Sequence, residues 1–123
     1  MKTISTDKAP SAIGPYSQAI VSGNLIFTSG QLPVDPITNE VVAGGIEEQA
    51  AQVMKNIGAV LSAVGVGYEN VVKTTCFLAD ITDFAMFNIV YAKYFTGKPA
   101  RSCVAVKDLP KGVKVEVEVI AEK

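Results

Sequence analysis

The C-terminal run from Val113 to Ala121 constrains the fold more than any other stretch of the chain. Valine fills every second position up to Val119, and Lys114, Glu116 and Glu118 stand between the valines. A period of two places alternate side chains on opposite faces of a β-strand. The pattern therefore predicts a strand with one apolar face suited to packing against helices and a second face of mixed character.

Two segments have the pattern of amphipathic helices. Residues 46–64 repeat apolar side chains every three or four positions, carry two glutamates in the first turn and are followed by Gly65. A second helix is expected to begin at Thr82 or Asp83, either of which is a good capping residue, and to run to about Phe95.

Apolar, β-branched or aromatic runs predict the strands. They cover residues 2–5, 16–21, 25–29, 71–78, 101–106 and 113–121, and we expect one more short strand near Val41. Two helices cannot cover both faces of one sheet. We therefore predict a single domain over residues 1–123 with an α+β fold, in which both helices pack on one face of a mixed, mainly antiparallel sheet. The uncovered face favours self-association.

Composition excludes several classes of function. Eleven basic and twelve acidic residues give a net charge of −1, so a nucleic-acid partner is not expected. The absence of histidine excludes Ser-His and Cys-His nucleophilic pairs, and two cysteines do not make a metal site. No apolar run is long enough to span a membrane, and the N-terminal residues lack a signal peptide's apolar block. Cytoplasmic residence with reduced thiols is the expectation.

Candidate chemistry centres on Arg101, Cys103 and Glu116. If the last two strands are neighbours joined by a short turn, Arg101 and Glu116 lie side by side, either as an ordinary surface ion pair or as a carboxylate clamp beside a proton acceptor. The pattern alone favours the ion pair. Cys103 is either a small buried apolar residue or the donor of a backbone amide to a substrate oxyanion.

Two loop-to-strand junctions carry glycines. They are Gly14, which precedes Pro15 and Tyr16, and Gly30, which lies between Ser29 and Gln31. A glycine at such a junction either lets a backbone amide approach a ligand closely or only makes a turn.

With these features assembled, the chain resembles the Rid family of reactive-intermediate deaminases, also called YjgF-type proteins. The likeness covers essentially the whole sequence. It rests on the segments 12–16 (AIGPY), 27–31 (FTSGQ), 72–75 (VKTT), 83–88 (DFAMFN), 99–104 (PARSCV), 109–110 (LP) and 115–118 (VEVE). Because the arginine and the glutamate of the deaminase pattern are both present, the imine-deaminating subgroup is the closer likeness.

The resemblance implies a chorismate-mutase-like fold in a homotrimer with a central barrel-like core and active sites in clefts between subunits. It implies hydrolysis of 2-iminobutanoate and 2-iminopropanoate, products of pyridoxal-phosphate enzymes such as threonine dehydratase, to 2-oxo acids and ammonia. No cofactor and no metal are needed for this reaction.

The resemblance also implies roles for individual residues. Arg101 binds the substrate carboxylate, and Glu116 orients and activates the attacking water. Tyr16 closes the pocket from a neighbouring subunit, while Asn88 and backbone groups of Gly30 and Cys103 line it.

One segment departs from the family pattern. Many members have a longer stretch before the arginine motif, often with an aromatic residue before the proline, whereas this chain has a short segment over residues 96–99 with Lys98 before Pro99. The size of the pocket, the preferred imine and the enzyme that produces it therefore stay open. Two other functions stay open as well: a ribonuclease or translation inhibitor, and a ligand-binding or chaperone-like trimer without turnover.

Overall fold

The computed structural model describes all 123 residues and contains six strands and two α-helices. The strands are β1 (Lys2–Ile4), β2 (Ala19–Ser22), β3 (Leu25–Thr28), β4 (Val71–Leu78), β5 (Ala100–Ala105) and β6 (Val115–Glu122). The helices are α1 (Ile46–Ala63) and α2 (Phe84–Tyr94), and three short 3-10 turns are η1 (Tyr68–Asn70), η2 (Ile81–Asp83) and η3 (Pro110–Gly112).

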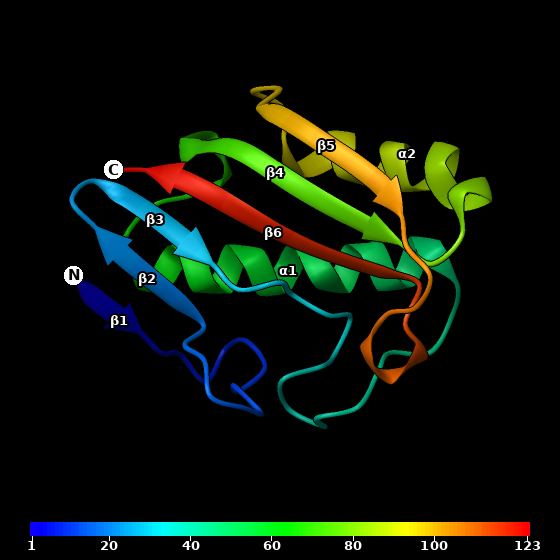
Figure 1. Cartoon of the computed structure of the whole chain (residues 1–123), viewed down its shortest axis with the longest axis horizontal. Helices are drawn as coiled ribbons and strands as arrows, with labels where there is room; N and C mark the ends of the chain where they lie inside the picture. Colours follow the sequence, from blue (N-terminus) through cyan, green and yellow to red (C-terminus); the bar gives the residue numbers. More distant parts are fainter.

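All six strands form one sheet in the order β1-β2-β3-β6-β4-β5. Every neighbouring pair is antiparallel except β4 and β5, which run parallel. Both helices lie on the same side of this sheet, behind it in the view of Figure 1. The α+β architecture predicted from the sequence is therefore confirmed.

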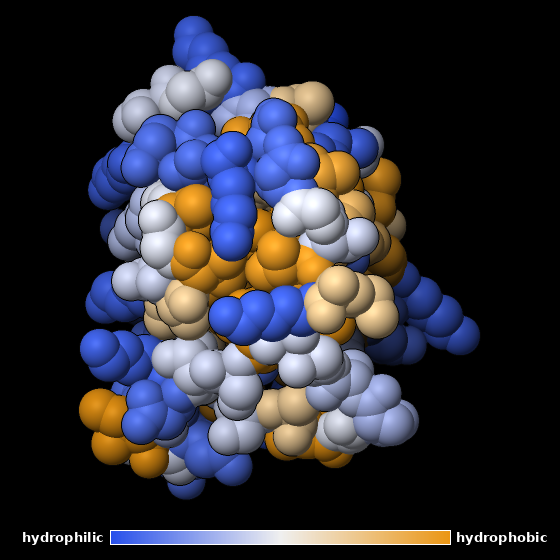
Figure 2. Space-filling model, turned by 90° about the vertical axis from the view of Figure 1, so that its left-hand side faces the viewer, coloured by the Kyte–Doolittle hydropathy of each residue, from blue (hydrophilic) through white to orange (hydrophobic).

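Strand β6 lies inside the sheet, between β3 and β4, and supplies the centre of the core. Val115, Val117, Val119 and Ala121 are all buried on the helix side of the sheet. Figure 2, which views the surface of the molecule from the end where both termini lie, shows exposed apolar side chains in the middle of that face with hydrophilic ones around them. The alternating pattern thus predicts the buried face of β6 correctly.

Helix α1 packs its apolar stripe on the sheet and also anchors a long loop. Its first turn is capped because the Glu48 side chain accepts a hydrogen bond from the Gly45 amide at 2.8 Å, and the chain leaves the helix through Gly65 at φ +82°. The Asn56 side chain, which is 1% exposed, donates to the carbonyls of Leu32 and Val34, both at 2.9 Å. These two bonds hold the loop between β3 and α1 against the helix.

The prediction that the last two strands are neighbours in the sheet is wrong. Strand β5 pairs only with β4, and β4 lies between β5 and β6. The segment from β4 through α2 to β5 is a strand–helix–strand crossover, the connection that parallel neighbouring strands require. Arg101 is in register with Thr74 and Glu116 with Phe77, so the two charged residues are separated by a strand and do not form an ion pair.

Smaller differences concern the ends of elements. Strand β2 begins at Ala19, so Tyr16 lies in the preceding loop, and the strand expected near Val41 is a single bridge between Val34 and Val41. Helix α2 begins at Phe84 without a side-chain cap, because the capping carboxylate is that of Asp80, which accepts from the amide of Thr82 at the start of η2. Neither helix has the length and apolar character that a membrane crossing requires.

Candidate active site

The side chain of Arg101, the only arginine of the chain, is held by helix α2. Its Nη1 donates to Asn88 Oδ1 at 2.7 Å, and its Cζ lies 4.8 Å from the ring centroid of Tyr91 and 5.5 Å from that of Phe84. The Tyr91 hydroxyl is fixed in turn by the buried Thr74 hydroxyl, 2.8 Å away. The guanidinium is therefore oriented by an amide and by aromatic rings, and its remaining N–H groups are free to bind an anion.

This arginine borders a groove of about 520 Å³. The groove lies between α2 and the start of β5, and the residues that line it include Asn88, Tyr91, Phe95, Lys98, Pro99 and Arg101. The short segment over residues 96–99 forms part of this wall, with Lys98 in the left-handed region at φ +54°. A planar guanidinium at the edge of an open groove suits bidentate binding of a carboxylate.

Glu116 belongs to a second groove on the opposite face of the sheet. This groove has a volume of about 350 Å³ and is lined by Tyr16, Gly30, Leu32, Pro110 and Glu116 among others. Burial raises the pKa of the Glu116 carboxyl above its ordinary value, and repulsion from Glu118 raises the pKa further. A carboxylate that binds a proton more tightly than usual is a better proton acceptor.

The position of Gly30 explains why glycine is needed beside Glu116. The bonds between Gln31 and Val117, at 2.8 and 3.2 Å, hold this junction against β6. A Cβ on residue 30 would overlap the carboxylate of Glu116, with the carboxyl carbon only 2.8 Å away. The small residue therefore leaves room for the carboxylate at the mouth of the groove.

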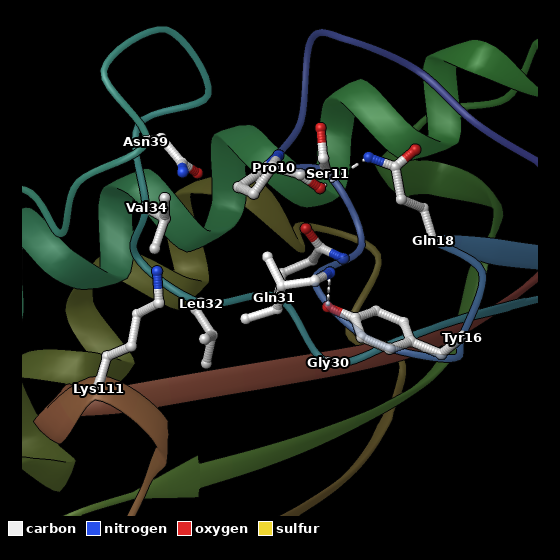
Figure 3. Close-up of a pocket in the computed structure, with 11 residues that line it drawn as sticks. Pro10, Ser11, Tyr16, Gln18, Gly30, Gln31, Leu32, Val34, Asn39 and Lys111 are labelled. Atoms are coloured by element: carbon white, nitrogen blue, oxygen red, sulfur yellow. Dashed lines mark hydrogen bonds between the residues drawn. The ribbon is translucent and has the colours of Figure 1, made fainter.

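Tyr16 lies across this groove on the loop that precedes β2. Figure 3 shows its ring beside Gly30. On the other side of the adjoining cavity, the Lys111 side chain reaches toward it. Gln18, which is 4% exposed, anchors the loop by donating to the carbonyls of Thr6, Ala9 and Pro10 at 2.7 to 3.3 Å. The tyrosine itself is 49% exposed, so its ring can contact a molecule that enters the groove.

The structure thus divides the predicted site residues into two groups. Arg101, Asn88 and Cys103 lie on β5 and α2, whereas Tyr16, Gly30 and Glu116 lie around the second groove. Thr74, the register partner of Arg101, points to the helix side, and Phe77, the partner of Glu116, points to the open side. One copy of the chain therefore does not bring the arginine and the glutamate into one pocket. No group of three or more Cys, Asp or Glu side chains is placed to hold a metal ion.

Comparison with known proteins identifies the family. A sequence model of the family described as "Endoribonuclease L-PSP" matches residues 6–123. The chain is 50% identical over 121 residues to the 2-iminobutanoate/2-iminopropanoate deaminase of Rattus norvegicus, an alignment that covers 98% of this chain and 88% of the rat protein. A solved structure of a Rid-family protein from Yersinia pestis has a TM-score of 0.96 at 49% identity and covers 99% of this chain and 98% of that one. This chain belongs to the Rid family.

A second structure of this kind contains a ligand. Escherichia coli TdcF with bound serine is similar to this chain with a TM-score of 0.95 at 43% identity, over 100% of this chain and 99% of that one. The Rid-family resemblance and the fold that it implies are therefore confirmed for essentially the whole chain.

Tyr91, Phe84 and Thr74 are residues at this Rid-family site that the sequence did not predict. Phe84, Asn88 and Tyr91 are spaced four and three positions apart, which places them on one side of a helix. That spacing, combined with a parallel β4–β5 pair, is the signal that would have placed Phe84, Asn88 and Tyr91 beside Arg101.

Proposed function

We propose that this protein hydrolyses 2-imino acids and their enamine tautomers, including 2-iminobutanoate and 2-iminopropanoate, to 2-oxo acids and ammonia. The observation that carries the proposal is an oriented arginine with free donors in one groove and a carboxylate of raised pKa in another. These groups match the two needs of the reaction, which are recognition of the substrate carboxylate and acceptance of a proton from water. The name of the rat relative supports the same reaction.

The site that we propose is built from two copies of the chain. Arg101 and Glu116 lie on opposite faces of one sheet, so a single substrate meets both only if a neighbouring copy supplies one of them. The open face of the sheet exposes apolar side chains suited to such an interface, among them Leu25 (37% exposed), Phe27 (41%) and Val104 (46%). A closed ring of three copies with three such clefts is the assembly that we propose.

In this site the imino acid is held by its carboxylate. Arg101 binds both carboxylate oxygens, and Asn88 keeps the guanidinium plane in position. Tyr16, from the neighbouring copy, covers the substrate, and the Cys103 backbone amide lines the cleft. The imine carbon is already electrophilic, so correct positioning beside water supplies much of the rate increase.

Glu116 moves the protons. Its carboxylate accepts a proton from water as the water oxygen bonds to the imine carbon, and the imine nitrogen takes up a proton from solvent, which gives a carbinolamine. Glu116 then returns its proton to the nitrogen, the carbon–nitrogen bond breaks and ammonia leaves, and the hydroxyl releases its proton to solvent as it becomes the carbonyl of the 2-oxo acid. The sum is one imine and one water converted to one oxo acid and one ammonia.

The test generates 2-iminobutanoate in the assay with threonine dehydratase and follows the release of the 2-oxo acid against semicarbazide trapping of the free imine. Wild-type protein should accelerate release, and Arg101→Ala should abolish that acceleration while its circular dichroism stays that of the folded protein. Lys55→Ala, which removes an exposed cation from α1, is the control and should keep wild-type activity. Wild-type activity in Arg101→Ala would contradict the proposed site. Several amino-acid precursors compared in the same assay would give the preferred imine.

The description of the family model favours a second candidate, cleavage of RNA. The net charge of −1 and the lack of histidine argue against it, because RNA binding depends on clustered cations. Incubation of a labelled RNA with wild-type and Arg101→Ala protein separates the two activities. Cleavage that both proteins share, without imine turnover by the wild type, would favour the ribonuclease, and saturable binding of a 2-oxo acid without turnover would favour a binding protein.

A further inference from the structure

The two cysteines of the chain form a cross-strand pair. Cys76 on β4 and Cys103 on β5 are direct register partners, so their side chains leave the same face of the sheet. Neighbouring strands lie about 4.8 Å apart, which falls inside the Cα separation of about 4.4–6.8 Å that disulfides span. Both thiols are free in this structure.

The two sulfur atoms are close enough to influence one another. Each thiol contributes to the pKa shift of the other, and the Cys76 thiol also donates to the Thr74 hydroxyl at 3.8 Å. Cys76 is fully buried, whereas Cys103 is half-buried and therefore within reach of a small solute.

Strand β5 can also move. It is the edge strand of the sheet and has β4 as its single partner, so a shift of β5 toward or along β4 breaks no second ladder of hydrogen bonds. The Cβ atoms of a disulfide are about 3.8 Å apart, closer than register partners at the usual strand spacing. An edge strand can make that approach more easily than a strand held on both sides.

We propose that Cys76 and Cys103 are a modification site that a hydroperoxide converts into a reversible disulfide within one chain. The Cys103 sulfur attacks the outer peroxide oxygen, the O–O bond breaks, and the leaving oxygen takes up the Cys103 proton and departs as an alcohol or water. The resulting sulfenic acid on Cys103 is attacked by the Cys76 sulfur; the S–O bond breaks, and the Cys76 proton leaves with that oxygen as water. Two thiols are oxidised and one peroxide is reduced.

The surroundings of the two thiols indicate which of them reacts first with the peroxide. Burial raises the pKa of Cys76 to about 12, so this thiol is a poor first nucleophile. Burial also raises the pKa of Cys103, but the nearby guanidinium of Arg101 opposes that rise and stabilises the thiolate. The more exposed sulfur beside the cation therefore reacts first, and the buried sulfur resolves the sulfenic acid from its register position.

The test treats the full-length protein with hydrogen peroxide and measures intact mass, followed by peptide mapping without reductant. The expected product has lost the mass of two hydrogen atoms, contains a peptide pair linked through Cys76 and Cys103, and regains both thiols with dithiothreitol. Mapping separates this change from oxidation of the three methionines.

Cys76→Val is the matched control, because valine replaces a buried thiol with an apolar side chain of similar size. This variant should add oxygen atoms to Cys103 and form no linked peptide. Three results would each overturn the proposal: a wild-type protein in which the two cysteines stay reduced, oxygen added to Cys103 without a link to Cys76, and a disulfide that joins two chains. None of these readouts depends on deaminase activity.

Discussion

At the scale of single residues, the site depends on how neighbours tune two charged groups. The guanidinium of Arg101 is oriented by one short bond to Asn88 and by the Tyr91 ring, so its position is set by α2. Glu116 is tuned by burial and by Glu118 two positions along β6. The identity of both charged residues follows from the sequence, because their types suit the chemistry, but their surroundings depend on the sheet order.

The raised pKa of Glu116 predicts the pH dependence of the reaction. Glu116 must be ionised to accept a proton, so kcat/KM should fall as the pH drops through its pKa in the folded protein. That acid limb should lie above the ordinary glutamate value of about 4.3. The measurement is the pH profile of 2-oxo acid release, corrected at each pH for the spontaneous hydrolysis of the imine.

Glu118→Gln tests the cause of this shift. The variant removes the repulsion that contributes to the raised pKa, so its acid limb should move to lower pH while the burial of Glu116 still keeps it above that of a free glutamate. Glu47→Gln, on the exposed start of α1, should leave the limb where it is. Acid limbs that coincide in wild type and Glu118→Gln would contradict the contribution of Glu118 to the raised pKa of Glu116, and a wild-type limb at or below the ordinary glutamate value would show that Glu116 does not set the pH dependence.

At the scale of elements, the periodicity of apolar residues predicts most of the helices and strands, but it does not predict the order of the strands in the sheet. The alternation of valines predicts β6, and the three-and-four spacing over residues 46–64 predicts α1 almost to the residue. The pairing of β5 with β4 is not visible in either strand alone, because both strands are equally able to pair with β6. The crossover through α2 decides the pairing, because parallel strands need such a helical connection and the nine-residue link between β5 and β6 does not exclude it.

The contact of α1 with the loop after β3 gives a prediction about stability. Asn56→Ala leaves the buried carbonyl of Val34 without a donor and removes one of the two donors to the carbonyl of Leu32, which keeps the amide of Val34, so the free energy of unfolding should fall by about 2–4 kcal/mol. Urea denaturation of the two proteins measures this difference. Gln52→Ala, which removes a half-exposed donor to Asn56 at 2.9 Å, should cost only about 0.5–1.5 kcal/mol. Equal losses in the two variants would show that the loop anchor is not the source of the effect.

At the scale of the whole molecule, the open face of the sheet is the dominant feature. Leu25 and Phe27 on β3 pair with Glu122 and Ile120 on β6, and all four side chains lie on the face away from the helices. An exposed apolar sheet face on a small domain favours burial against another copy. The sequence predicts that such a face exists, because two helices cover only one side, but it does not specify how many copies meet there.

The proposed ring of three predicts the mass in solution. The chain has a mass of 13.0 kDa, and sedimentation equilibrium should give about three times that value. Phe27→Lys places a charge on the open face and should shift the population toward monomer, whereas Lys55→Ala on α1 should not. A wild-type mass near that of one chain would rule out the assembly.

The central claim is that one active site takes Arg101 from one copy and Glu116 from the next. Arg101→Ala and Glu116→Ala chains, coexpressed with different tags and purified through both, form rings that contain both variants. Each such ring has one cleft with both native residues, so the mixed protein should show about a third of the wild-type rate, although each variant alone shows none. Doubly tagged rings as inactive as the separate variants would contradict the claim, because that result requires both residues to act from the same copy.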